Sequence, residues 1–494
     1  MPAAEWTYNV KPRYKTDWIA CRHRGWAGRT GLVFAWGMVC ALNVPSSVAD
    51  MPNIVLLMAS GQRAGMAGFE GNPQVKTPHL DRLAAEAVVF PRTYAPSPYR
   101  QQNVASVATG LYPHAHGAVA DGVYLLPGTD TVVARLRRAG YTCGLVGQWG
   151  VGGREQADPV EGLFDHAATC VGDCPWQDSE VVINGDKGKV DGSLADWITE
   201  QATGFLTAAR DKPSFLWVTF RGPRPPFAGA AEGATTVAAG DLPLPESMAY
   251  EREGLPGVLS NAEPSRQFLA MNEQQLREAR AAYATAIMQL DASVGRILQA
   301  VEQQGGPGRP TVVVWASDGG FLLGEHRLYG TGAFFYDELI RVPLVIRCPA
   351  LVKEGVRVER VVSLVDLGPT LLGLAGQPVP PTMHGRSLVP VLQNPRTRLH
   401  ADECFLVYEQ QDGPLSARGL ISRHYKYVSY TDVGDILYDL ARDPLELYNV
   451  SSIPEYQTVV RVLGDRLDAW RKATRDPRWR EEPTMGFAIP PFFR

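Results

Sequence analysis

Short apolar runs alternate with helix-like segments along most of the chain. Each run is continuous and uncharged, which is typical of a strand buried on both faces of a sheet. The clearest runs cover residues Asn53–Ala59, Thr142–Val146, Ser214–Phe220, Thr311–Ala316 and Pro343–Ile346. Because strand and helix patterns alternate throughout, the sequence predicts an α/β fold in which helices sandwich a large, mostly parallel sheet.

The helix-like segments carry recognisable start signals. Thr77 and Pro78 mark the start of one helix, because proline is favoured at the first helical position. The longest helix is expected from Glu273 to Gln303, where Asn272 and Gln275 offer a capping box. Its apolar residues recur at spacings of four and three and predict a core-facing stripe, made of Tyr283, Ile287, Leu290, Val294, Ile297 and Val301.

The pattern divides the chain into three parts. Residues 1–49 form a leader, residues 50–393 the large α/β domain, and residues 394–494 a smaller α+β subdomain. In the subdomain we expect three strands and one helix, at Phe405–Tyr408, Gly419–Ser422, Tyr425–Tyr430 and about Tyr456–Ala473. Within the large domain, Gly229–Pro264 is rich in glycine, alanine and proline without periodicity, which predicts a long surface insertion.

The composition is that of a globular protein without a strong charge field. The 494 residues are 45% hydrophobic, which is enough for a large core. The 48 basic and 52 acidic residues give a formal net charge of −4. This balance offers no broad attraction for nucleic acid or an anionic membrane, so no nucleic-acid partner is expected and any anion site must be local.

The leader has the features of an export signal. Arg22, Arg24 and Arg29 precede an apolar run, Gly31–Val44, which is followed by the small-residue pattern Ser47–Ala49. The run has about 14 residues, fewer than the roughly 20 that a spanning helix needs, so no stable membrane span is expected. We therefore expect a secreted or periplasmic (lumenal) protein. An uncleaved anchor and a misassigned start codon are the alternatives.

Five cysteines remain after the leader, where export would expose them to an oxidising compartment. Cys170 and Cys174 are close enough in sequence to bridge a small loop, whereas Cys143, Cys348 and Cys404 are scattered and expected to be buried. No second pair of cysteines or histidines stands at ligand spacing, which argues against a zinc site.

A series of short motifs occurs in a fixed order along the large domain and into the subdomain. The motifs are Gly71–Glu86, Thr109–Gly117, Ser317–Asp318, Leu323–His326, Arg341–Pro343, Val362–Asp366, His384–Ser387 and Leu437–Leu440. In order and spacing this series resembles the sulfatase family over roughly residues 52 to 450. The resemblance implies the alkaline-phosphatase-like fold. It also implies hydrolysis of sulfate esters by a formylglycine made from cysteine, with a calcium ion and basic side chains that hold the sulfate.

The position of the family's nucleophile is arginine in this chain. Ser97-Pro98 and Thr109-Gly110 set the register without a gap. Where the family has Cys-x-Pro-x-Arg, the chain reads Arg100-Gln-Gln-Asn-Val104, and the family motif occurs nowhere else. A guanidinium stays protonated and only donates hydrogen bonds, so it can neither attack sulfur nor become formylglycine. No catalytic residue is therefore assigned.

The metal ligands implied by the resemblance are mostly absent. The family places two acidic or amide ligands where this chain has Ser60 and Gly61, and a further pair where it has Asp318 and Gly319. Only Asp318 survives. Because calcium takes six to eight oxygen ligands with several carboxylates among them, no metal or other cofactor is expected. Calcium would be expected only if the family site proved functional.

The basic groups of the family site have also changed. The family's Lys-Trp-His is Gln148-Trp149-Gly150, the lysine expected before Gly332 is Thr331, and the histidine expected after the third apolar run is Arg224. The scaffold motifs stay close to the family pattern while the changes fall on functional positions. This distribution indicates a pseudo-sulfatase rather than general sequence decay.

Three interpretations of the altered site follow. We expect Arg100, Arg224 and Gln148 to converge with Asp318, and Arg63 to lie near them. Arg100 would begin a helix whose free N–H groups favour an anion, so the first interpretation is a pocket that binds sulfated or other anionic sugars. In the second, the arginines pair with Asp318 and fill the pocket. The third is a new catalytic chemistry.

Three functions accordingly stay open at this stage. The first is a non-catalytic receptor for sulfated or anionic saccharides. The second is an active sulfuric-ester hydrolase by family descent, which fold resemblance alone would suggest. The third is a non-catalytic scaffold that pairs with an active sulfatase, for which the insertion Gly229–Pro264 is the obvious variable surface.

Overall fold

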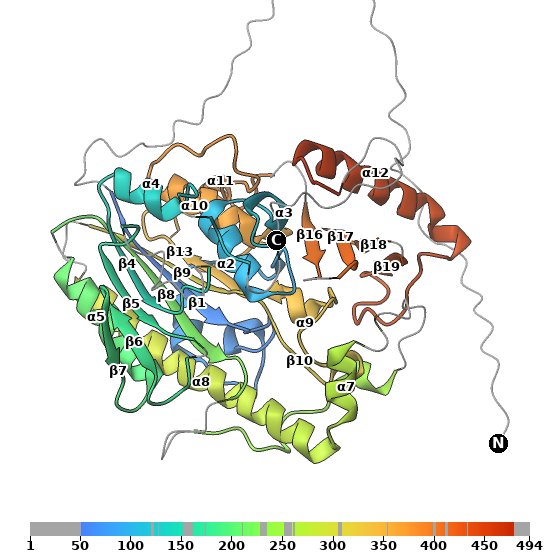
Figure 1. Ribbon diagram of the computed structural model, residues 1–494, viewed down its shortest axis with the longest axis horizontal. Coiled ribbons are helices and arrows are strands. Elements are labelled where there is room, and N and C mark those ends of the chain that lie inside the picture. Colours follow the sequence, from blue (N-terminus) through green and yellow to red (C-terminus); the bar gives the residue numbers. More distant parts are fainter. Residues whose placement is uncertain are drawn as a thin grey trace, which may run out of the picture. The chain divides into compact units, whose positions relative to one another are not determined.

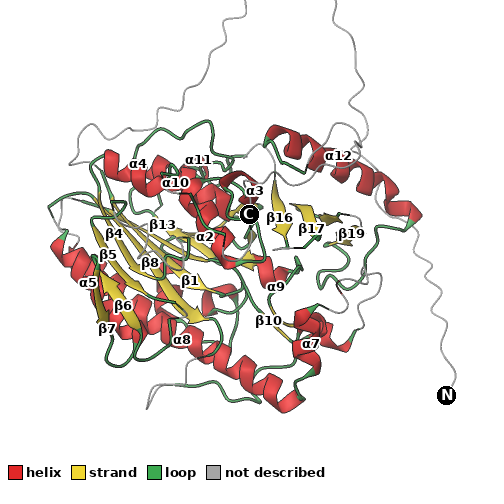
Figure 2. Cartoon of the chain, in the orientation of Figure 1, coloured by secondary structure: helices red, strands yellow, loops and turns green. Residues whose placement is uncertain are grey.

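A ten-stranded sheet forms the centre of the fold (Figures 1 and 2). The structure is a computed structural model that describes residues 51–119, 123–126, 128–151, 162–172, 174–209, 211–227, 235–250, 259, 262–304, 309–352, 354–398, 402–410, 413–431 and 433–478. In spatial order, the strands are β14 (Val356–Arg357), β2 (Val88–Val89), β13 (Leu344–Arg347), β9 (Thr311–Ser317), β1 (Asn53–Ser60), β8 (Ser214–Pro223), β4 (Thr142–Gly147), β5 (His166–Cys170), β6 (Glu180–Ile183) and β7 (Asp186–Lys189). The five strands predicted from apolar runs are therefore confirmed.

The central strands of the sheet are parallel, as the sequence predicts. β1 pairs in parallel with β8 and β9, and β4 pairs in parallel with β8 and β5. Antiparallel pairs flank this centre: β13 pairs with β9 and β2, and β6 pairs with β5 and β7. Neighbouring parallel strands bring their carboxyl ends to one edge of the sheet, where open α/β sheets place their ligand sites.

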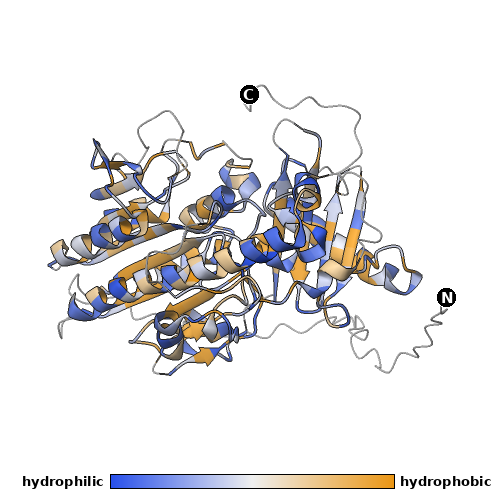
Figure 3. Ribbon diagram, turned by 90° about the horizontal axis from the view of Figure 1, so that it is seen from below, coloured by the Kyte–Doolittle hydropathy of each residue, from blue (hydrophilic) through white to orange (hydrophobic). Residues whose placement is uncertain are grey.

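Helices cover both faces of the sheet and leave its apolar strands in the middle (Figure 3). Side chains of β1 alternate between the faces, with Ile54, Leu56 and Met58 on one and Val55 and Leu57 on the other. The first face is covered by α2 (Arg100–Thr109), α4 (Val132–Arg138) and α10 (Leu367–Leu374). The second is covered by α1 (Pro78–Ala85), α5 (Leu194–Ala208) and α8 (Glu273–Gln304).

Shorter elements connect these layers. The helices among them are α3 (Pro113–His116), α7 (Glu263–Leu269), α9 (Asp337–Ile340) and α11 (Val389–Gln393). Two small sheets are built from β10 (Leu322–Leu323) with β11 (Tyr329–Gly330), and from β12 (Arg341–Val342), β3 (Thr93–Tyr94) and β15 (Val362–Ser363).

The long helix α8 confirms its sequence prediction. The backbone N–H of Asn272 donates to Oε1 of Gln275 at 2.9 Å, and the N–H of Gln275 donates to Oδ1 of Asn272 at 2.8 Å, which makes a capping box. All six residues of the predicted stripe are buried. Within the stripe, the Tyr283 hydroxyl donates to the carbonyl of Gly61 at 2.8 Å, so α8 also supports the segment that follows β1.

The C-terminal subdomain is an antiparallel sheet packed against one helix. Its strands, in spatial order, are β16 (Glu403–Glu409), β17 (Ser416–Ser422), β18 (Tyr425–Tyr430) and β19 (Gly434–Asp439), and the helix is α12 (Gln457–Ala473). Leu463, Leu467 and Trp470 of α12 pack against Leu420 and Leu437 of the sheet. The three predicted strands and the helix are confirmed, and β19, which the apolar pattern did not predict, completes the sheet.

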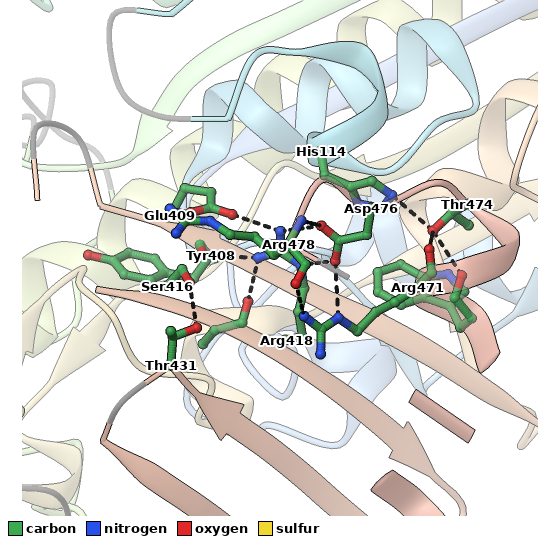
Figure 4. Close-up of polar contacts among 12 residues, drawn as sticks. His114, Tyr408, Glu409, Ser416, Arg418, Thr431, Arg471, Thr474, Asp476 and Arg478 are labelled. Atoms are coloured by element: carbon green, nitrogen blue, oxygen red, sulfur yellow. Dashed lines mark hydrogen bonds and ion pairs between the residues drawn. The ribbon is translucent and has the colours of Figure 1, made fainter. Parts of the chain in front are cut away.

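A buried ion-pair cluster ties the end of α12 to this sheet (Figure 4). Arg418 on β17 donates from Nε to Oδ2 of Asp476 at 2.6 Å and from Nη2 to Oδ1 of Asp476 at 2.8 Å. Its Nη2 also lies 2.7 Å from Oε1 of Glu409, and Arg478 donates to the other oxygen of Glu409 at 3.0 Å. The two-point contact between guanidinium and carboxylate fixes the segment after α12 in place.

The predicted insertion is only partly a surface loop. Among its described residues, Val237 and Leu242 are buried against α8, and the N–H of Val237 donates to Oγ1 of Thr285 at 3.0 Å. Pro264 lies within α7 and is buried too. The prediction was wrong for these positions, because a segment without periodicity can still bury single apolar side chains on a neighbouring helix.

The cysteine predictions are confirmed. Cys170 and Cys174 form a disulfide, with their Cα atoms 5.5 Å apart, while the free cysteines are all buried, namely Cys143, Cys348 and Cys404. The predicted leader lies outside the described residues. Within the described part of the chain, no helix is long and apolar enough to cross a membrane.

Candidate functional site

The candidate site lies at the carboxyl ends of four neighbouring strands, β9, β1, β8 and β4. Ser60 is the last residue of β1, and Asp318, Arg224 and Gln148 directly follow β9, β8 and β4, respectively. Arg100, the first residue of α2, joins them from the helix that covers this edge. The parallel register therefore brings together residues that are far apart in the sequence, as expected from the resemblance.

The side chain of Arg100 is bound to three of these residues. Its Nε donates to Oγ of Ser60 at 3.0 Å and to Oδ2 of Asp318 at 3.2 Å, and its Nη2 donates to Oε1 of Gln148 at 2.7 Å. The Asp318 side chain is fully buried, whereas 24% of the Arg100 side chain is exposed. The other carboxylate oxygen of Asp318, Oδ1, accepts a hydrogen bond from the N–H of Gly61 at 3.0 Å. Asp318 is thus committed to a guanidinium.

Asn103, which the sequence analysis did not select, holds the start of α2 against the end of β9. Its Nδ2 donates to the carbonyl of Asp318 at 2.7 Å and to the carbonyl of Ser97 at 2.8 Å, and its Oδ1 accepts the N–H of Ser97 at 3.0 Å. This fully buried amide links the site's helix to its acidic residue. A buried amide cannot be recognised from a pattern of apolar residues, so only the contacts identify it. The next residue, Val104, lies in the apolar core.

Gly150 lies against the guanidinium of Arg100. A Cβ atom on Gly150 would lie 3.4 Å from Nη2 of Arg100, and its φ of +71° favours glycine in any case. In the resemblance to sulfatases, this position is the histidine of Lys-Trp-His. A Cβ atom at this distance would only touch the guanidinium, so the backbone conformation rather than space favours glycine here.

Gln148 connects the two arginines of the site. Its Oε1 accepts from Arg100 and also from Nη2 of Arg224, the latter at 3.3 Å. Its Nε2 donates to the carbonyl of Gly172 at 3.1 Å. Together Arg100, Arg224 and Asp318 carry two positive charges and one negative charge. We refer to Arg100, Gln148, Arg224 and Asp318 as the arginine cluster.

Arg63 does not join the arginine cluster through its charge. Its Nη1 forms an ion pair with Oε1 of Glu325 at 2.8 Å, and Arg280 contacts the same oxygen at 2.8 Å. Burial opposes ionisation of Glu325, but the two guanidiniums outweigh it and lower its pKa to about 2. The expectation that Arg63 contributes to the pocket is not met, because a buried carboxylate on a distant segment engages its charge.

The donor set at this edge does not suit a calcium ion. Asp318 is the single carboxylate of the arginine cluster, both of its oxygens accept hydrogen bonds, and a guanidinium nitrogen lies 3.2 Å away. The oxygens of Ser60 and Gln148 also accept from Arg100. Calcium needs more oxygen ligands than this and would be repelled by the arginines. Among the described residues, no group of three or more His, Cys, Asp or Glu side chains could hold a metal ion.

We therefore expect the purified, dialysed protein to carry no stoichiometric calcium, magnesium or zinc at the arginine cluster. Elemental analysis measures this directly. Added calcium should also leave Tm unchanged, because a ligand raises Tm only by binding the folded state. One divalent ion per chain that disappears in Asp318→Ala would contradict this prediction.

The sequence as a whole matches known sulfatases. The sulfatase family profile matches residues 52–377, and a profile for the C-terminal part of N-sulphoglucosamine sulphohydrolase matches residues 324–473. An ulvan-active sulfatase of Formosa agariphila is 28% identical over 435 residues, which cover 84% of this chain and 80% of that protein. The N-acetylglucosamine-6-O-sulfatase of Bacteroides thetaiotaomicron is 23% identical, with 92% of each chain covered.

Solved structures share the fold. A protein in complex with its substrate D-glucosamine-2-N,6-O-disulfate has a TM-score of 0.78 at 22% identity, over 88% of this chain and 100% of that chain. A phosphonate monoester hydrolase of Agrobacterium radiobacter has a TM-score of 0.71 at 23% identity, over 86% and 96% of the two chains. These neighbours confirm the predicted alkaline-phosphatase-like fold. Because the family profile covers well over half of its residues, the chain belongs to the sulfatase family.

Proposed function

We propose that this member of the sulfatase family does not hydrolyse sulfuric esters and instead binds an anionic group of a saccharide, such as a sulfate, at the arginine cluster. One observation carries the proposal. The guanidinium of Arg100, which the resemblance aligns with the family's nucleophile, is bonded to Asp318, the acidic residue that the resemblance aligns with a metal ligand. The changed positions thus form one connected arrangement of charged and polar groups.

The loss of hydrolysis follows from the chemistry of these groups. Arg100 offers only N–H donors, and Asp318 is buried against it, so neither can act as a nucleophile toward sulfur. Gln148 and Arg224 replace the family's proton-handling side chains with an amide and a second guanidinium. A site with this composition can hold an anion but supplies no atom to attack it.

The gain of anion binding follows from charge and geometry. The arginine cluster itself contains two guanidiniums and one carboxylate, and the hydrogen bonds of Arg100 to described residues use Nε and Nη2 rather than Nη1. Arg100 also begins a ten-residue helix, whose N-terminal end carries a partial positive charge. Two relatives act on saccharides by name, the ulvan-active and N-acetylglucosamine-6-O sulfatases, which supports a sulfated sugar as the ligand class.

We expect sulfate and sulfated saccharides to bind the purified protein, while neutral sugars of the same size do not. Charge-assisted hydrogen bonds contribute about 1.5 to 3 kcal/mol each, so two guanidiniums can support roughly micromolar to millimolar affinity. Calorimetric titration measures this affinity, which should fall as salt is added. Arg100→Ala and Arg224→Ala should each weaken binding roughly tenfold or more.

The control is Arg82→Ala, which removes a half-exposed arginine that pairs with Glu302 on the surface. It should bind like the parent. If Arg100→Ala and Arg224→Ala also bind like the parent, the receptor proposal fails. The ion pair between Arg100 and Asp318 would then favour a filled pocket and the scaffold function, whose test is co-purification with a sulfatase partner.

A further inference from the structure

A disulfide-bonded segment, Cys170–Cys174, lies directly beside the arginine cluster. It leaves β5 at Cys170, and its disulfide closes a loop with a sequence separation of 4. Within the loop, the carbonyl of Gly172 accepts the hydrogen bond from Nε2 of Gln148 at 3.1 Å. The Oε1 atom of Gln148 accepts hydrogen bonds from both Arg100 and Arg224. The disulfide-bonded segment therefore contacts the residue that links the two arginines of the cluster.

A second contact joins the same segment to Arg224. Arg221, which is almost fully buried, donates from Nε to the carbonyl of Cys174 at 2.7 Å and from Nη1 to the carbonyl of Arg224 at 2.8 Å. Its Nη2 donates to the carbonyl of Pro225 at 3.0 Å, and its guanidinium lies 4.9 Å from the ring centre of Trp176. One buried side chain thus spans the disulfide segment and the backbone that carries Arg224.

These contacts determine which way the Gln148 amide faces. A primary amide has donors on nitrogen and an acceptor on oxygen, so donation to Gly172 leaves Oε1 directed at Arg100 and Arg224. With the amide reversed, its N–H groups would face two guanidiniums and bind neither. The oxygen therefore offsets the repulsion between two like charges, and it does so only while the carbonyl of Gly172 stays in place.

We propose that the disulfide-bonded segment Cys170–Cys174 positions Gln148 and Arg224, so that the geometry of the arginine cluster, and with it the affinity for an anion, depends on the disulfide. The ligand-binding part of this inference rests on the function proposed above. The geometric part does not, because it concerns hydrogen bonds within the protein alone. Two measurements separate them.

The first measurement is nuclear magnetic resonance of the full-length protein with ¹⁵N-labelled arginine. The Nε–H signal of Arg100 is assigned by its loss in Arg100→Lys. In the double variant Cys170→Ser/Cys174→Ser we expect this signal to shift or broaden, since Gln148 is released. Val171→Ala, a change at an exposed residue of the same loop that keeps the disulfide, should leave the signal unchanged.

The second measurement is calorimetric titration with sulfate and a sulfated disaccharide. The double variant should bind roughly tenfold more weakly than the parent, the effect of about one lost charge-assisted hydrogen bond. If the double variant does not fold, Arg221→Lys, which keeps the disulfide and the charge but loses the three-way contact, should shift the signal of Arg100.

The outcomes are distinguishable. If the parent binds no anion but the signal of Arg100 depends on the disulfide, the proposed function fails and the positioning role stands. If the parent binds and neither the disulfide variant nor Arg221→Lys changes the signal or the affinity, the positioning role is overturned and the proposed function stands. A change in Val171→Ala as large as in the double variant would also overturn it, because the effect would not be specific to the disulfide.

Discussion

Aryl sulfates, sugar sulfates and phosphonate monoesters should remain intact during long incubation with this protein. In a well-studied hydrolase, removal of the nucleophile alone lowers kcat by about 10⁶, and the resemblance implies that the neighbouring proton-handling groups of this chain have changed as well. Arg100 cannot be converted to formylglycine, so expression with or without a formylglycine-generating enzyme should give the same result. Sulfate release, measured by ion chromatography against a buffer blank, tests this.

The outcome that would contradict this prediction is specific. Turnover that disappears in Arg100→Ala or Asp318→Ala would mean that the arginine cluster is catalytic and the chain is an active sulfuric-ester hydrolase, as family membership also allows. Turnover that survives both substitutions would locate an activity elsewhere. As a matched control, Arg82→Ala should change neither result, because this arginine lies on the surface at α1.

Arg418→Met should lower the free energy of unfolding by about 3 to 5 kcal/mol, because it leaves two carboxylates without their principal cation in the interior. The side chains of Arg418 and Asp476 are 4% and 0% exposed, and Glu409 is also mostly buried. Methionine has a similar length and fills the space, so the loss reports the missing charge rather than a cavity. Urea denaturation monitored by circular dichroism measures the change.

Two variants calibrate this result. Arg82→Met removes an ion pair at 2.8 Å whose side chains are 52% and 51% exposed, and it should cost about 1 kcal/mol or less. Arg418→Lys keeps the charge but loses the two-point contact with Asp476. Its decrease in the free energy of unfolding should therefore fall between those of Arg418→Met and Arg82→Met. If Arg418→Met cost no more than Arg82→Met, the cluster shown in Figure 4 would not stabilise the subdomain.

The arrangement of the site was partly predictable, because residues that directly follow parallel strands of one sheet lie at the same edge of that sheet. Ser60, Gln148, Arg224 and Asp318 each follow an apolar run that reads as a strand, and parallel strands in one sheet end at a common edge. Their convergence could therefore be expected before any contact was known. The placement of Arg100 at the start of α2 could be expected in the same way from its fixed register with the family motif.

The partner of each charge was not predictable in this way. The sequence predicted that Arg63 would lie near Arg100, yet its charge pairs with Glu325 while Arg100 pairs with Asp318. The partner of a long flexible side chain depends on which carboxylate lies within reach after packing, and periodicity carries no such information. Asn103 was missed for the same reason, since its role consists of contacts across the fold.

The sequence by itself determined the α/β class and the approximate extent of the main strands and helices. It also showed that Cys170 and Cys174 are close enough to bridge and, through the family resemblance, predicted the loss of the nucleophile. Each of these depends on the identity of residues at local or fixed spacings. Only the tertiary structure decided that Arg100 pairs with Asp318, that Gly150 lies against its guanidinium, and that Gln148 joins two arginines beside the disulfide. Those features require distances between segments that lie far apart in the chain, and such distances exist only once the sheet has assembled and the helices have packed on it.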